Sequence, residues 1–184
     1  IIAGFGMAVL AGVEICLRLM GLVWMPLMGL SLACGTLVGH NLGAKKLEQA
    51  EKTALKAGSM GALTMIGVAV VFLLFSRQLV SLFNHTEEVV QAGEAVFKIV
   101  SPFLVFLGIH IPLSGAFYGS GDTKPAMIIT FLTSFCFQIP MMLFMSRLLG
   151  VNGVFLAFGL SMLVGLCILL IWFFKGDWKH RKLE

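Results

Sequence analysis

Charged residues are scarce in this sequence. Asp, Glu, Lys and Arg make up 12% of its 184 residues, whereas 59% are hydrophobic. A soluble domain carries about 25% charged residues, so the deficit excludes an ordinary soluble protein. Several uncharged runs are long enough to cross a bilayer as helices. Because a bilayer leaves no water to satisfy backbone polar groups, we expect an all-α integral membrane protein.

CxxC pairs are also lacking, and we do not expect the first residues to be a signal peptide. None of the four cysteines forms a CxxC pair, and all lie in apolar runs, where we expect them to pack as small hydrophobic residues. The formal net charge of +4 comes from residues between apolar runs, so it reports membrane topology and not nucleic-acid binding. The chain opens on Ile1 with no basic segment, which is untypical of a signal peptide. We expect a piece of a larger membrane protein.

The uncharged runs predict about five complete transmembrane helices within residues 13–175. We place the spans at about 13–42, 57–76, 95–118, 125–147 and 152–174. Residues 1–12 are predicted to be the end of a preceding helix and its turn, and residues 176–184 a cytoplasmic tail. Pro26 predicts a kink in the first span.

The distribution of basic residues predicts the orientation. With alternate loops on the same side, nine Lys and Arg residues collect on one side and four on the other. The positive-inside rule then places the Gly121 loop and the C-terminus in the cytoplasm. This orientation requires a helix before residue 12.

Local signals predict helix ends and helix contacts. Thr86, followed by two glutamates, predicts an N-cap, and Glu14 and Arg18 are spaced for an ion pair. Glycines recur every four residues at Gly35, Gly39 and Gly43, which favours close approach of another helix. Ala157, Ser161 and Gly165 form a second such ridge.

Four stretches, in order over residues 8–182, resemble the multidrug and toxic compound extrusion (MATE) transporter family. They are MPLMGLSLACGTLVGHNLGAKKLEQA, LFNHTEEVVQAGEAVFKIVSPF, GAFYGSGDTKPAM, and LGVNGVFLAF followed by FFKGDWK. In the first stretch His40 stands where the family more often has Gln. The resemblance implies helices eight to twelve of a twelve-helix transporter, plus the end of helix seven. This is most of the C-terminal six-helix lobe.

The resemblance also implies a function. The expected activity is cation-coupled antiport, driven by H⁺ or Na⁺, that exports bulky, often cationic organic compounds and drugs. Two lobes would rock around a central cavity in the bacterial cytoplasmic (inner) membrane. The expected partners are the lipid bilayer and a missing N-terminal lobe, with no nucleic acid. No cofactor or metal is expected besides the coupling ion, and the isolated fragment is expected to be inactive.

Polar and polarisable groups inside the spans are the candidates for the substrate and cation pathway, because such groups are costly in a membrane. The candidates are Glu14, Trp24, Met28, His110 and Gln138. Glu14 either pairs with Arg18 or senses cations at the cavity mouth. His110 either titrates or joins two helices, and Gln138 lies just before Pro140, which frees a backbone carbonyl.

Two further features concern gating and coupling. Candidate residues for helix ends and gating loops are Gly39, His40, Asn41, Gly43, Gly121 and Asp122. Family members often carry an acidic residue on the helix that corresponds to residues 95–118. His110 is the only ionisable side chain between Ile99 and Phe117, which favours H⁺ coupling or coupling from the missing lobe.

Three alternative functions compete with antiport. A lipid-linked oligosaccharide flippase would need a basic cavity, and the spans hold no Lys or Arg at mid-depth. A membrane enzyme would need a set such as HExxH, which does not occur, so we expect no enzymatic activity. A non-transporting membrane subunit remains open for the fragment alone.

Overall fold

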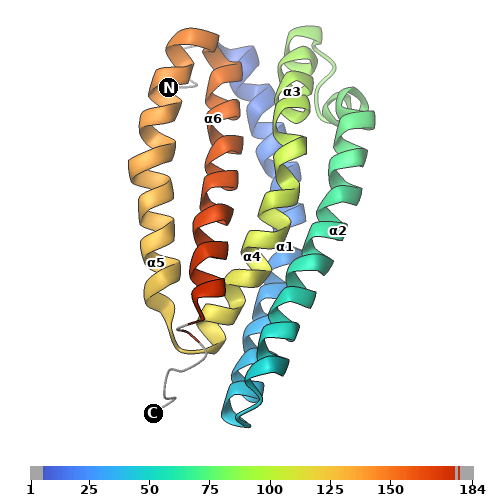
Figure 1. Cartoon of the computed structure of the whole chain (residues 1–184). Coiled ribbons are helices and arrows are strands. Elements are labelled where there is room, and N and C mark those ends of the chain that lie inside the picture. Colours follow the sequence, from blue (N-terminus) through green and yellow to red (C-terminus); the bar gives the residue numbers. More distant parts are fainter. Residues whose placement is uncertain (1–5, 177, 179–184) are drawn as a thin grey trace.

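The computed structural model describes residues 6–176 and Trp178, and these residues form an all-α bundle without strands (Figure 1). The prediction of an all-α protein is therefore confirmed. The elements in chain order are α1 (Met7–Gly43), α2 (Leu47–Ser81), α3 (Glu87–Val100), the 3₁₀ turn η2 (Ser101–Phe103), α4 (Leu104–Gly119), α5 (Thr123–Phe131), the π-helix η3 (Leu132–Gln138) and α6 (Ile139–Lys175).

Four continuous helical stretches of the described chain are long and apolar enough to cross a membrane. They are Met7–Gly43, Leu47–Ser81, Glu87–Gly119 and Thr123–Lys175. The last stretch is interrupted at Gly150, whose φ of 60° and ψ of −137° are not helical. A positive φ is readily adopted only by glycine. The segments before and after Gly150 run antiparallel (Figure 1).

The first helix begins earlier than predicted. Residues 7–12 are its first turns, so the turn expected to end at residue 12 is wrong for this part of the chain. The break lies at Gly6, with a φ of 104°, whereas Gly12 packs against α3. Residues 1–5 and most of the predicted tail lie outside the described residues. Hydropathy could not place this start, because it marks the apolar length of a helix and not its ends.

The second helix also begins earlier, at Leu47 and not at residue 57. Residues 47–56 are charged and amphipathic, so they extend the helix beyond the apolar run. Its last part is bent at Phe75, which has a φ of −115°.

Glycine contacts hold α4 against α2. A Cβ atom added to Gly61 of α2 would collide with the carbonyl oxygen of Gly108 in α4. That carbonyl is the one for which Pro112 provides no N–H group in the helix. It lies against the Cα of Gly61, where a weak Cα–H···O contact is available. The two backbones therefore touch directly.

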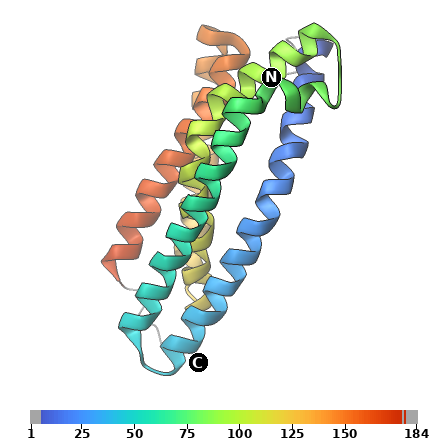
Figure 2. The same ribbon diagram turned by 90° about the vertical axis from the view of Figure 1, so that its right-hand side faces the viewer.

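The glycine ridge on α1 packs against α4 as predicted for two of its three residues. A Cβ on Gly35 would lie 2.9 Å from the carbonyl oxygen of Gly115, and one on Gly39 would lie 2.9 Å from that of Gly119. A Cβ on Gly43 would have no neighbouring atom within 4 Å, so the predicted helix contact at Gly43 is wrong. As a result, α4 is in backbone contact with both α1 and α2, and α1 and α6 lie on opposite sides of α4 (Figure 2).

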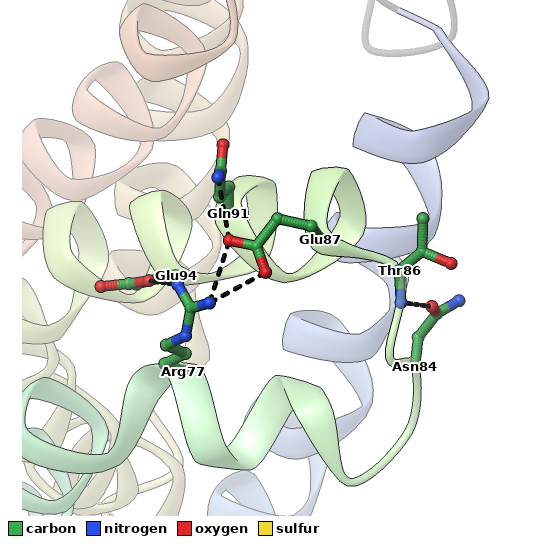
Figure 3. A network of polar contacts seen from close by, with 6 residues as sticks. All are labelled: Arg77, Asn84, Thr86, Glu87, Gln91 and Glu94. Atoms are coloured by element: carbon green, nitrogen blue, oxygen red, sulfur yellow. Dashed lines mark hydrogen bonds and ion pairs between the residues drawn. The ribbon is translucent and has the colours of Figure 1, made fainter.

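A network of ion pairs joins the end of α2 to α3 (Figure 3). Arg77 donates to both carboxylate oxygens of Glu87 at 2.9 and 2.8 Å, and its other terminal nitrogen lies 3.8 Å from Glu94. Gln91 donates to Glu87 at 2.9 Å, and Lys98 pairs with Glu94 at 2.6 Å. These charged side chains therefore hold the end of α2 against α3 across the short turn.

The N-cap of α3 differs from the prediction. Thr86 occupies the N-cap position, but its hydroxyl makes no capping bond. Its carbonyl instead accepts from the N–H groups of Val89 and Val90 at 3.0 Å. The Thr86 N–H donates to the Asn84 side chain at 2.8 Å, which is an Asx-type turn.

The glycine contact predicts a position-specific loss of stability. Gly61→Ala should lower the free energy of unfolding by about 1–3 kcal/mol, because the new methyl group meets rigid backbone. Gly67 lies in the same helix with nothing within 4 Å, so Gly67→Ala should be neutral or slightly stabilising. Thermal midpoints of the purified protein in detergent provide the comparison. Equal midpoints for the two variants would contradict the contact.

The ion-pair network between α2 and α3 predicts a pH dependence. Hydrogen bonds from Gln91 and Arg77 hold the pKa of the Glu87 carboxyl below its ordinary value of 4.5. The stabilisation is therefore complete above that value and is lost as the pH falls below it and Glu87 takes up a proton. Glu87→Gln removes this titration, so the thermal midpoint of the variant should fall less as the pH is lowered through this range. Glu88→Gln serves as the control, and an equal flattening there would argue against the network.

Candidate functional site

Two adjoining cavities lie between α1, α4, the α5–η3 segment and α6. One has a volume of about 120 Å³ and the other about 170 Å³, and His110 and Thr130 line both. Met28, Ser31, Ser114 and Tyr118 belong to the smaller cavity. The larger one is lined by Trp24, Gln138, Phe158 and Ser161, among others. Together they form the His110 site.

Three hydroxyl groups of the His110 site are turned toward their own helices. Ser114 donates to the carbonyl of His110 at 2.8 Å, Thr130 to that of Ala126 at 2.9 Å, and Ser161 to that of Phe158 at 2.7 Å. A hydroxyl has one proton and two lone pairs, so its oxygen remains an acceptor. These three hydroxyls therefore present acceptor oxygens, which suit a ligand that donates hydrogen bonds or carries positive charge.

His110 is the central group of the site. It is the lining residue of both cavities whose ordinary pKa is nearest to neutral, and no Asp, Glu, Lys or Arg lines either one. Its ring lies beside α6 where a Cβ on Gly165 would be 3.8 Å from Nε2. The small residues Ser161 and Gly165 thus border the cavity and make room for the imidazole.

The structure brings four of the five pathway candidates together. Trp24, Met28, His110 and Gln138 all line the His110 site. Glu14 does not: it is exposed near the start of α1. Its expected ion pair with Arg18 is wrong, since neither residue is in an ion pair within residues 6–176. Both side chains are exposed, where such a pair stabilises little.

The sequence interpretation missed the hydroxyl residues of the site. These are Ser31, Ser114, Thr130, Thr133, Ser134 and Ser161. The signal that could have revealed part of this set is the spacing of Thr130, Thr133, Ser134 and Gln138, a polar stripe in an otherwise apolar helix.

Several candidates for gating lie near the end of the bundle that holds the α1–α2 turn. Gly39 and His40 line a third cavity of about 410 Å³, which shares Ser31 and Tyr118 with the smaller cavity of the His110 site. Asn41 donates to Thr53 at 3.4 Å and so joins α1 to α2.

The turn after α4 contains the other two gating candidates. Gly121 has a φ of 74°, and Asp122 follows it at the N-cap position of α5. The Asp122 carboxylate makes no capping bond, while its N–H donates to the Ser120 hydroxyl at 3.4 Å.

Comparison with known families decides the relationship. The family model MatE matches residues 1–144. The chain belongs to the MatE family. The resemblance inferred from the four sequence stretches is thereby confirmed. The members of this family are transporters and not enzymes, which agrees with the expectation of no enzymatic activity.

Curated relatives of this MatE chain include two bacterial proteins. The probable multidrug resistance protein NorM of Thermotoga maritima is 28% identical over 173 residues, which cover 93% of this chain and 37% of the relative. The probable multidrug resistance protein YpnP of Bacillus subtilis is 25% identical over 183 residues, which cover 100% and 41%. The MatE chain thus spans about two fifths of the length of these relatives.

Solved structures show the same fold. The Vibrio cholerae MATE transporter VcmN in its bent form superposes with a TM-score of 0.88 at 21% identity, over 95% of this chain and 40% of that one. An outward-facing MATE family transporter gives a TM-score of 0.86 at 20% identity, over 99% and 41%. The helical arrangement of the MatE chain is therefore that of a large part of such transporters.

Proposed function

We propose that this chain forms most of the C-terminal lobe of a twelve-helix transporter in the bacterial inner membrane. The hairpin at Gly150 divides the last long stretch in two, so the lobe piece has five complete spans. The α1–α2 turn with Lys45 and Lys46 lies at the same end of the bundle as the turn before Lys124, which supports a cytoplasmic position for both (Figure 1). Helix α6 also ends at this end of the bundle, at Lys175. The missing N-terminal lobe would face the His110 site, and the chain alone would be inactive.

We propose that the complete protein exports bulky, often cationic organic compounds. The observation that carries this function is the His110 site itself: acceptor oxygens, Trp24 and Met28 surround a space without fixed charge. An aromatic face attracts cations, and Met adapts to varied apolar groups. A flippase for a lipid-linked pyrophosphate would need basic residues, and none other than His110 lines these cavities.

His110 supports coupling to H⁺ and not to Na⁺. Protonation places one positive charge in the cavity, where it repels a bound cationic substrate more strongly than in water. Proton binding and substrate binding are therefore mutually unfavourable. Such competition at one site is sufficient for exchange of one against the other when two lobes alternate their access.

The function predicts a transport phenotype. The full-length protein should lower ethidium accumulation in an efflux-deficient bacterium, and dissipation of the proton gradient should abolish this effect. Replacement of Na⁺ by K⁺ should leave it unchanged. His110→Gln keeps hydrogen-bonding capacity without titration, so ethidium binding to this variant should lose its pH dependence between about pH 5 and 8.

Matched controls separate the possible results. His85 is exposed in the turn between α2 and α3, so His85→Gln should keep the pH dependence. Unchanged dye accumulation at confirmed membrane expression would identify a non-transporting subunit. A strict Na⁺ requirement, or a pH response that survives in His110→Gln, would overturn the proposed coupling.

A further inference from the structure

One wall of the His110 site is not α-helical. Residues Leu132–Gln138 form a π-helix, in which the Ile139 N–H donates to the carbonyl of Ser134, five residues earlier. None of these seven residues is buried. On the face away from the cavity, the rings of Phe131 and Phe135 stack with centroids 5.1 Å apart. Tight packing therefore does not impose the π register on this segment.

Pro140 gives a local reason for the π register. Proline has no N–H, so it cannot donate to Cys136 as an α-helix requires, or to Phe135 as a π-helix requires. Either register leaves one carbonyl without its donor at this point. An α-helix normally makes one more backbone hydrogen bond here than a π-helix does. Because Pro140 cannot donate that bond, the α register loses this advantage immediately after the segment. Long π-helices are rare, and short ones occur frequently at functional sites.

The register decides which side chain faces the cavity. In a continuous α-helix, the eight residues from Thr130 to Gln138 turn the chain by about 800°, which would leave Gln138 about 80° away from Thr130 around the axis. A π-helical segment fits about one extra residue into its turns and so turns the following residues back by about 100°. Gln138 then stands within about 20° of Thr130, and both residues indeed line the larger cavity.

The same calculation identifies the residue that an α register would present. Phe137 follows Thr130 by seven residues, which places it within about 20° of Thr130 in an unbroken α-helix. In the structure Phe137 does not line the His110 site. At this position of the wall, the π register therefore presents the amide of Gln138, whereas an α register would present the ring of Phe137.

We propose that Pro140 is a positioning residue that holds the π register and thereby turns the Gln138 amide into the His110 site. The amide supplies a hydrogen-bond donor and an acceptor to the cavity that His110 also lines, beside Thr130 and Thr133, whose hydroxyls donate to their own helix. The contribution of Gln138 to ligand binding rests on the proposed transport function. The register itself does not depend on that function.

The register is tested by cysteine labelling of the full-length protein without its native cysteines. Gln138→Cys should react readily with a small water-soluble thiol reagent, and Phe137→Cys should react several-fold more slowly. Pro140→Ala restores an N–H donor, and in that background the two reactivities should be exchanged. Faster reaction at position 137 in the Pro140 protein would overturn the register. So would an unchanged pattern in Pro140→Ala. The comparison of Gln138→Cys with Phe137→Cys in the protein that keeps Pro140 tests the register even if Pro140→Ala does not fold.

A reciprocal exchange tests the consequence for binding. The double substitution Phe137→Gln with Gln138→Phe should weaken ethidium binding about fivefold in the Pro140 protein, the effect of one lost hydrogen bond. In the Pro140→Ala background, the same exchange should restore binding. A purely structural role of Pro140 predicts additive losses and no rescue. Correct labelling combined with additive losses would reject the positioning role while leaving the π register intact.

Discussion

The direct contact of helix backbones through glycine is the constraint on which this structure depends. Lipid tails are as apolar as the side chains, so membrane helices associate chiefly through close packing and polar contacts. Gly61 and Gly108 bring α2 and α4 together, and Gly35 does the same for α1 and α4. Because α4 is held on these sides, its remaining surface, which carries His110 and Ser114, faces the hairpin of α5, η3 and α6. The cavities form between these two parts.

The chemistry of the His110 site follows from how its polar groups are satisfied. Ser and Thr hydroxyls in apolar helices donate to carbonyls of the preceding turn, as Ser114 and Thr130 do. Each therefore presents an acceptor to the cavity without leaving a donor unpaired in the membrane. The imidazole of His110 lies among these acceptors, and no Asp, Glu, Lys or Arg is among the described residues that line the two cavities. This combination is the basis of the proposed competition between a proton and a cationic ligand.

Much of this arrangement could be predicted from the sequence, and the exceptions have physical reasons. Intramembrane polar groups tend to face protein or cavity, so His110 and Gln138 could be selected without coordinates. Hydropathy identified the apolar stretches but not the helix starts at Met7 and Leu47, where the helices extend past the apolar region. Glu14 was misjudged because spacing alone does not show whether an exposed pair forms.

The π-helix could not be predicted from a sequence pattern with a period of 3.6 residues. That period places Gln138 away from Thr130, whereas the structure aligns the two. The spacing of the polar residues indicates a polar face, but only the backbone register shows that Gln138 lies beside Thr130 on it. Its origin in Pro140 could have been suspected, but the direction in which a proline disturbs a helix depends on the packing around it.

Photoaffinity labelling of the full-length protein with an azido derivative of ethidium, followed by peptide mapping, tests most directly whether the His110 site holds the ligand. Adducts on Trp24, Met28 and Met162, suppressed by excess unmodified ethidium, are the expected result, since these side chains line the two cavities. Met60 and Met127 are 58% and 66% exposed and line none of these cavities, so they report non-specific labelling. Suppressible adducts confined to those two methionines would contradict the account.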